Sequence, residues 1–316
     1  MASITNPITS GSEPHQGDPR ISWPTERIRR PNPSQEWHPS DLLDRRASNT
    51  SDDFENDFEN PSSALRHTHI SNYPKGTKSL SGISLRAFLI GTSLGITATV
   101  TILLITVFPT PLWRVPFFIA SLSVFHFLEF YTTATYNTPA ADVKAFLLSS
   151  NGWAYNAAHG SAIVECIVSH VFWPGQSKLG KLVSFTEPVL GTSVSLGLVV
   201  GLLLTGVGQV VRSIAMAQAA SNFNHHVQST HKQGHTLVTH GLYRFLRHPS
   251  YFGFFWWGLG TQLVLGNVVC FFAYALVLWK FFSTRIKREE TFLIQFFGAE
   301  YVGYRQSTPV GIPGIQ

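Results

Sequence analysis

Apolar residues of this chain gather in long runs, nearly all of them beyond residue 80. Four runs are long enough to cross a hydrocarbon core of about 30 Å as helices. They span residues 85–108, 115–136, 155–173 and 188–220. Two shorter runs, 251–265 and 268–282, are separated by Gly266-Asn267, which predicts a tight helical hairpin. The pattern therefore predicts an all-α membrane protein with about six transmembrane helices.

The two arms of this hairpin are short. At about 1.5 Å per residue each arm reaches only about 22 Å. We expect the pair to cross obliquely, to thin the bilayer locally or to re-enter the same face.

The first 80 residues have a different composition. They contain eleven acidic and nine basic residues, many Pro, Ser and Asn residues, and a tandem DFEN repeat at 53–60. Such a segment cannot bury enough apolar surface to fold. The chain is therefore divided into a disordered polar tail (1–80), four membrane helices (81–220) and a catalytic region that contains the hairpin and a cofactor-binding segment (221–316).

Charge gives the expected orientation. Beyond residue 80, seven carboxylates stand against fourteen Lys and Arg residues, and the sequence pI is about 9.3. With six spans and a cytosolic N-terminus, Arg114, Lys178 and Lys181 face the far side. The basic residues that then face the cytosol are Lys75, Lys78, Lys144, Lys232, Arg244, Arg247, Arg285, Lys287, Arg288 and Arg305. This asymmetry follows the positive-inside rule and predicts that both termini are cytosolic.

Several classes of function are disfavoured. No basic stripe alternates with stacking aromatics, so we expect no nucleic-acid partner. The glycines at 206–208 lie inside an apolar run rather than between a strand and a helix, which argues against a Rossmann fold. His231 and His235 are four residues apart but lack a neighbouring carboxylate or thiolate, so we predict no metal site.

Small and acidic residues inside the spans predict helix contacts. Gly91 and Gly95 in the first span, and Gly197 and Gly201 in the fourth, have spacings that allow close helix packing. We expect these contacts within the chain. The intramembrane acids Glu129 and Glu165 form no evident proton relay, and we expect each to hydrogen-bond a neighbouring helix.

The most polar membrane-proximal stretch is 234–257, followed by Arg285, Glu289 and Glu290. Ionisable groups beside hydrocarbon are costly and usually functional. The segment 247–251, RHPSY, predicts a stiff turn before a helix, either presenting Arg and His to an anion or forming an interfacial turn. Arg285 and Glu289 are four residues apart and share a helix face, as a surface pair or as part of a site for a cationic ligand.

These residues occur in ordered motifs that resemble the isoprenylcysteine carboxyl methyltransferases, integral membrane enzymes of the endoplasmic reticulum. The resemblance covers about 190 residues, from about Phe125 onward. Its motifs are HFLEF (126–130), SNFNH (221–225), HTLVTHGLY (235–243), RHPSYFG (247–253), REE (288–290), FFGAEY (ending at Tyr301) and PVGIP (309–313).

The resemblance implies an activity and a site. The methyl donor would be S-adenosyl-L-methionine, and the acceptor would be the α-carboxylate of the prenylated C-terminal cysteine of processed CaaX proteins, reached from membrane lipid. Arg285 would hold the substrate and act in catalysis. The implied cofactor residues are Gln228, His235, Thr236, Leu237, Val238, Tyr243, His248, Pro249, Ser250, Tyr251 and Glu289.

Other functions stay open at this point. A phospholipid or other small-lipid methyltransferase could use the same cofactor pocket, and an NADPH-dependent membrane reductase could share the architecture. A polytopic transporter or scaffold is the alternative outside enzymes, although the membrane part of the chain shows no internal repeat of the kind that transporters have.

Overall fold

The computed structural model describes residues 71–148, 150–172, 195–231 and 234–316. Residues 1–70, which make up most of the predicted disordered tail, lie outside this part. The described residues are all-helical and contain no strand, which confirms the predicted fold class. The α-helices are α3 (Leu80–Thr106), α4 (Arg114–Tyr136), α5 (Gly152–Phe172), α7 (Leu196–Ala219), α8 (Pro249–Leu265), α9 (Val269–Phe297) and α10 (Ala299–Ser307). Short 3₁₀ turns are η3 (Pro111–Trp113), η4 (Thr138–Ala140), η5 (Val143–Phe146), η6 (Ala220–Asn222) and η7 (Gly241–Arg244).

A helix occupies the described part of each of the six predicted runs, while residue 173 of the third run and residues 188–194 of the fourth lie outside the described residues. Four segments have the length and apolar composition of a membrane span. These are Leu80–Thr106, Pro111–Tyr136, Leu196–Asn222 and Val269–Phe297. The remaining two, α5 and α8, have 21 and 17 residues. At about 1.5 Å per residue α8 is about 26 Å long, close to the short arm that we predict.

The second arm of the hairpin is longer than its apolar run indicates. We expect it to end near residue 282, but α9 continues without a break to Phe297 and has 29 residues. Its polar half is rich in Lys, Arg and Glu, which favour helix. Ile286 and Glu290 are buried there, so tertiary contacts also hold this half. The helix therefore extends well past the apolar stretch and carries Arg285 and Glu289.

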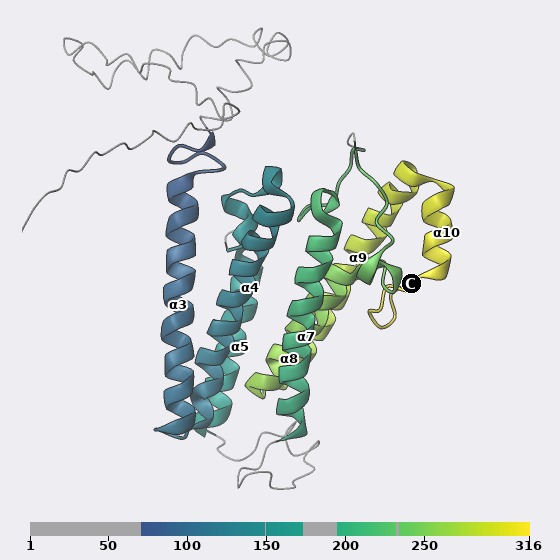
Figure 1. The fold of residues 1–316 in the computed structure, drawn as a ribbon. Coiled ribbons are helices and arrows are strands. Elements are labelled where there is room, and N and C mark those ends of the chain that lie inside the picture. Colours follow the sequence, from purple (N-terminus) through teal and green to yellow (C-terminus); the bar gives the residue numbers. More distant parts are fainter. Residues whose placement is uncertain (1–70, 149, 173–194, 232–233) are drawn as a thin grey trace, which may run out of the picture. The chain divides into compact units, whose positions relative to one another are not determined.

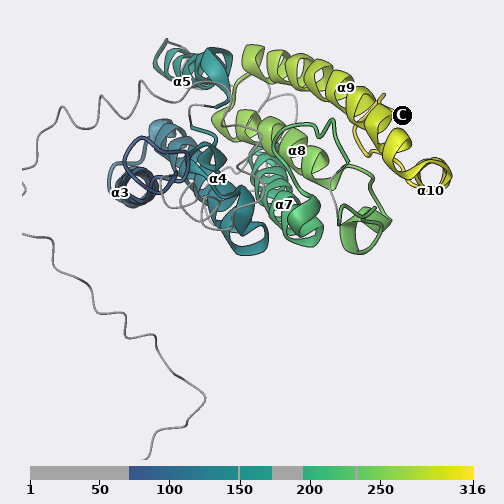
Figure 2. The same ribbon diagram turned by 90° about the horizontal axis from the view of Figure 1, so that it is seen from above.

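The helices pack side by side in an order that follows the chain only in part (Figures 1 and 2). Helix α3 packs on α4, α4 packs on α7, and α8 lies between α7 and α9, while α5 lies beside α9. The largest buried apolar cluster joins α4, α5, α8 and α9 with the C-terminal segment. The bundle thus brings the ends of α7 and α9 and the start of α8 to one region.

Backbone contact between α7 and α8 is the closest helix packing in the described chain. A Cβ atom added to Gly208 would lie 2.6 Å from the Gly253 oxygen and the Trp257 nitrogen. One added to Gly260 would lie 2.6 Å from the Thr205 nitrogen, and Gly201 is similarly crowded by α8. Glycine is required at these positions because the backbones touch.

The other predicted glycine contacts are wrong. A Cβ atom at Gly91, Gly95 or Gly197 would meet no atom within 4 Å. Among the described residues, these three glycines therefore contact no other helix. Small-residue spacing is common in apolar helices, and it does not specify which face packs.

Both intramembrane acids hydrogen-bond a neighbouring element, as we predict. Glu165 of α5 accepts the backbone N–H groups of Val268, Val269 and Cys270, at 2.7–2.8 Å, at the start of α9. These are groups that a helix leaves without intrahelical partners. Glu129 of α4 pairs with Arg212 of α7.

The predicted hairpin turn is present between α8 and α9. Gly266 adopts a left-handed conformation with φ of 77°, and its N–H caps the end of α8. At this end of the bundle the Arg114 guanidinium also donates to the Val264 oxygen at 3.0 Å. Glycine at 266 therefore suits the left-handed turn. It also leaves room for Arg114, because a Cβ atom at this position would lie 2.8 Å from Arg114 Nη1.

The C-terminal segment after α10 folds back on α9. Val310 and Ile312 are buried in the main apolar cluster. The Trp279 indole N–H donates to the Pro313 oxygen at 2.9 Å, and the Arg247 N–H donates to the Pro309 oxygen at 2.9 Å. This segment therefore fastens the start of α8 to α9.

The α7–α8 contact generates a prediction. Gly208→Ala should lower the thermal unfolding midpoint of the purified protein in detergent, because the new methyl group would overlap backbone atoms of α8. Overpacking of this kind typically costs about 1–3 kcal/mol. Gly206→Ala is the matched control, because a Cβ atom at Gly206 meets nothing within 4 Å. Equal midpoints for the two variants would contradict a tight α7–α8 contact at Gly208.

Candidate functional site

An open cavity lies where α7 ends, α8 begins and α9 meets α10. Its empty volume is about 850 Å³, including space that is open to solvent. Ten of the eleven residues implied as cofactor-binding line it. They are Gln228, His235, Thr236, Leu237, Val238, Tyr243, His248, Ser250, Tyr251 and Glu289. Pro249 does not line the cavity and is the first residue of α8.

The RHPSY segment forms the predicted turn. His248 lies at the N-cap of α8 with φ of −127°, and Pro249 occupies the first helical position, where its missing N–H costs no hydrogen bond. Ser250 and Tyr251 follow in the first turn of the helix and face the cavity. The proline therefore sets the direction in which this turn enters α8.

Glu290 occupies the position opposite the basic residues of this turn. Its Oε1 accepts from Arg247 Nε at 2.8 Å and from His248 Nε2 at 3.2 Å. Its Oε2 pairs with Arg305 Nε at 3.2 Å. Arg247 also donates through Nη1 to the Thr308 oxygen at 2.5 Å. The anion that Arg247 and His248 contact is thus a carboxylate of the chain itself, and the pairing joins α8, α9 and α10.

Arg285 and Glu289 are linked through Tyr251. The Tyr251 hydroxyl donates to Glu289 Oε2 at 2.5 Å and accepts from Arg285 Nε at 2.8 Å. The Arg285 guanidinium also lies 5.3 Å from the centre of the Tyr251 ring. The i, i+4 spacing therefore does place both residues on one face, but a tyrosine stands between them.

The charge of Arg285 is not matched by a carboxylate in the part of the chain that the structure describes. Its hydrogen-bond acceptors are the Tyr251 hydroxyl and, at 2.5 Å from Nη2, the backbone oxygen of His225. Arg212, Arg247 and Arg305 each pair with a glutamate instead. Arg285 is also absent from the cavity lining and lies behind Tyr251, with the exposed Phe281 ring 5.9 Å away.

Two loop segments form the outer wall of the cavity. Asn222 accepts the Thr236 N–H at 3.0 Å, which ties the SNFNH segment to the HTLV segment. The His235 ring packs 5.4 Å from the ring of Phe297. His231 packs against the same phenylalanine at 5.7 Å. These two histidines therefore belong to an aromatic wall.

Tyr243 and Tyr304 close the cavity on the side of α10. The Tyr304 hydroxyl donates to the Tyr243 oxygen at 2.5 Å, and the Tyr243 hydroxyl donates to the Ala215 oxygen at 3.3 Å. Burial raises the pKa of Tyr243 above its ordinary value and raises the pKa of Tyr304 to about 12. Both phenols are therefore neutral donors at physiological pH.

The cavity has further lining residues that sequence reasoning does not assign. They are Ala219, Asn222, Phe223, Asn224, His226, Arg247, Phe292, Leu293, Phe296, Phe297, Tyr301 and Tyr304. Most lie within or beside motifs that carry the resemblance, SNFNH and FFGAEY, and this proximity is the signal that could have identified them. Phe292 and Leu293 carry no such signal and are brought in by the continuation of α9.

Comparison with known proteins agrees with the motifs. The isoprenylcysteine carboxyl methyltransferase (ICMT) family matches residues 199–295. The protein-S-isoprenylcysteine O-methyltransferase of Saccharomyces cerevisiae is 46% identical over 198 residues, which cover 63% of this chain and 79% of the yeast protein. The Homo sapiens protein of the same name is 39% identical over 199 residues, which cover 63% of this chain and 64% of the human protein.

A solved structure is also similar. The eukaryotic intramembrane Ras methyltransferase ICMT matches with a TM-score of 0.65 and 31% identity, over 80% of this chain and 83% of that chain. The yeast relative is 46% identical to this chain over 79% of its own length. This chain therefore belongs to the isoprenylcysteine carboxyl methyltransferase family.

Proposed function

We propose that this protein transfers a methyl group from S-adenosyl-L-methionine to the α-carboxylate of a prenylated C-terminal cysteine, at the cytosolic face of the endoplasmic reticulum membrane. The observation that carries the proposal is the arrangement of Arg285, Tyr251 and Glu289 beside the cavity. A guanidinium with neutral acceptors stands on one side of the tyrosine, and a carboxylate stands on the other. Membership of the family supports the same activity.

The lining residues fit a sulfonium cofactor. Glu289 is the one carboxylate among the described lining residues, and it is only partly buried, so it can compensate a cationic group. Phe292, Phe296 and Phe297 offer an aromatic wall to a purine, while Asn222 and Thr236 offer polar groups. When bound, S-adenosyl-L-methionine would supply an electrophilic methyl group on a positively charged sulfur.

The acceptor needs orientation more than activation. An α-carboxyl group has an unperturbed pKa of about 3.5, so it is ionised at neutral pH and requires no general base. The task left to the residues of this chain is to align the carboxylate oxygen and to exclude water from it. Arg285 is suited to this role because its own acceptors are neutral and its Nη1 donates to no group among the described residues.

The apolar part of the substrate would come from the bilayer. The Arg285 guanidinium lies 5.3 Å from the ring of Tyr251, which faces the cavity, and 5.9 Å from the ring of Phe281, whose side chain is exposed on α9. An acceptor that reaches Arg285 from the side of Phe281 keeps its prenyl chain in lipid, while the cofactor occupies the aqueous cavity. In this proposal the prenylated acceptor approaches Arg285 from the side of Phe281, and the cofactor lies on the side of Tyr251.

The position of the cavity along the helices supports the proposed orientation in the membrane. The Asn137 side chain at the end of α4 donates to the Phe223 oxygen of the SNFNH segment at 2.9 Å. The cavity therefore lies at the end of α4 opposite to Arg114, where Lys144 is also found. Under the positive-inside rule this end would be cytosolic, which agrees with a substrate that is processed in the cytosol.

A direct assay tests the activity. The purified full-length protein in detergent, given tritiated S-adenosyl-L-methionine, should label N-acetyl-farnesylcysteine as a base-labile methyl ester and leave N-acetylcysteine unlabelled. Labelling of phospholipid in place of the prenylcysteine would favour the small-lipid alternative. Failure to bind S-adenosyl-L-methionine, with solute transport in liposomes, would overturn the proposal in favour of a transporter.

Separate roles are expected for the two charged residues. Glu289→Ala should raise the Kd for S-adenosyl-L-methionine by about 10-fold to 100-fold, because a hydrogen bond to a charged group is worth about 1.5–3 kcal/mol. Arg285→Ala should lower kcat on N-acetyl-farnesylcysteine strongly while changing cofactor affinity little. Calorimetric binding and initial rates measure the two effects.

The matched controls for these variants are Glu300→Ala and Arg288→Ala. Both side chains are exposed and neither lines the cavity. They should leave cofactor affinity and turnover near the wild-type values. Equal and small effects of Glu289→Ala and Arg285→Ala would refute the assignment of separate roles.

A further inference from the structure

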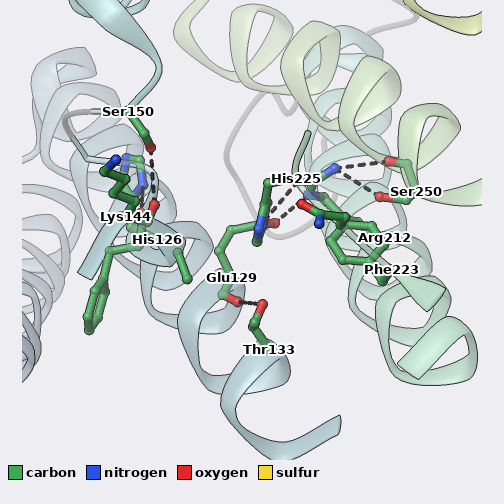
Figure 3. A network of polar contacts seen from close by, with 12 residues as sticks. His126, Glu129, Thr133, Lys144, Ser150, Arg212, Phe223, His225 and Ser250 are labelled. Carbon is green, nitrogen blue, oxygen red and sulfur yellow. Dashed lines mark hydrogen bonds and ion pairs between the residues drawn. The ribbon is translucent and has the colours of Figure 1, made fainter. Parts of the chain in front are cut away.

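Glu129 is a buried carboxylate that the proposed reaction does not use directly. It lies on α4, is 1% exposed, and does not line the cavity. Figure 3 shows its carboxylate pointing toward Arg212 of α7 and the His225 ring. Arg212 donates to it through Nε and, at 2.8 Å, through Nη2, and His225 Nε2 lies 2.9 Å from Oε2. Glu129 on α4 therefore contacts both α7, through Arg212, and the segment that contains His225.

The first contact leads to the start of α8. Arg212 Nη1 donates to Ser250 Oγ at 3.0 Å and to the Ser250 backbone oxygen at 3.3 Å. Figure 3 shows Arg212 between Glu129 and Ser250. Because Glu129 fixes the guanidinium from the other side, the RHPSY turn is held at a set distance from α4.

The second contact leads to Arg285. The His225 ring binds Glu129, and the His225 backbone oxygen accepts from Arg285 Nη2 at 2.5 Å. The acceptor that orients the Arg285 guanidinium is therefore placed by Glu129. Neighbouring residues of His225, Asn224 and His226, line the cavity.

Stability alone does not account for this network. A buried ion pair is often no more stabilising than apolar residues of the same volume, so its presence is weak evidence for a role in stability. Its connections are more informative. The two branches end at Ser250, which precedes Tyr251 in α8, and at Arg285, which donates to the Tyr251 hydroxyl. No other acid among the described residues contacts both branches.

We infer that Glu129 is a positioning residue for methyl transfer, which sets the Arg285 guanidinium relative to the RHPSY turn through His225 and Arg212. This inference rests on the proposed function, because it takes Arg285 as the group that aligns the acceptor carboxylate. A misplacement of about 1 Å in such a group can lower turnover by about 10²-fold.

A double-mutant cycle in the full-length protein tests the role. Glu129→Gln should lower kcat on N-acetyl-farnesylcysteine by about 10-fold to 100-fold at saturating cofactor. The Arg285→Lys variant lacks the guanidinium that donates to both Tyr251 and His225. In this background Glu129→Gln should lower kcat by less than about threefold, since the effects of residues that act as a unit are not additive. Equal losses of kcat in both backgrounds would overturn the inference.

Glu165→Gln is the matched control. Glu165 also accepts several hydrogen bonds, but it binds the start of α9 at the other end of the bundle. Its substitution should lower stability and leave kcat of the folded protein within about threefold in both backgrounds. If the effect of Glu165→Gln on kcat depended on the Arg285 background as strongly as that of Glu129→Gln, the cycle would be measuring helix packing and not positioning. That outcome would overturn the inference.

His225→Asn gives a second measurement if Glu129→Gln does not fold. His225 lies outside the helices, so its substitution removes the ring contact with Glu129 and keeps the backbone oxygen. His225→Asn should lower kcat as Glu129→Gln does, and by less in the Arg285→Lys background. An equal loss of kcat in both backgrounds would overturn the inference. Absence of methyl transfer by the wild-type protein would instead refute the proposed function, and this inference with it.

Discussion

Backbone contact between α7 and α8 is the constraint on which the site depends. A Cβ atom at Gly253 would lie 2.6 Å from the Gly208 oxygen and 2.7 Å from the Arg212 nitrogen. The same contact that packs the helices therefore brings Arg212 to the first turn of α8, where it reaches Ser250. A larger residue at Gly253 would separate the helices and the polar groups together. Packing and site geometry are thus set by the same residues.

Charge pairing is the second feature of the site. Buried charges are costly unless hydrogen bonds satisfy them. Glu129 accepts from Arg212 and His225, and Glu290 accepts from Arg247, His248 and Arg305. These pairings hold helices in place and leave little charge for a ligand. Arg285 differs from Arg212, Arg247 and Arg305 because its acceptors are neutral. They orient the guanidinium without cancelling its charge.

The sequence predicts much of this site because its motifs are local. Ten of the eleven implied cofactor residues share one cavity, and the proline turn at 249 begins a helix as its chemistry indicates. Helix contacts are less predictable, since they depend on which face turns toward a neighbour. Gly91 and Gly95 have the right spacing but contact no helix in the described part of the chain, whereas Gly253 and Gly260 contact α7 closely. The partnership of Glu129 with His225, 96 residues away, is likewise set only by the fold.

Two adjacent glutamates on α9, Glu289 and Glu290, have different surroundings. Successive residues of a helix point about 100° apart, so Glu289 and Glu290 cannot face the same group. Glu290 points inward, is 3% exposed and joins α8 to α10. Glu289 points to the cavity and accepts from Tyr251, which in turn accepts from Arg285. The basic residues of the turn pair with Glu290, so in the proposed function Glu289 would be available to a cationic ligand. The Tyr251 hydroxyl lies between Glu289 and Arg285. A direct ion pair between Glu289 and Arg285 would leave neither residue available to a ligand of opposite charge. In the proposed function, the tyrosine between them is therefore the feature that would allow one face of α9 to receive both a cationic cofactor and an anionic acceptor.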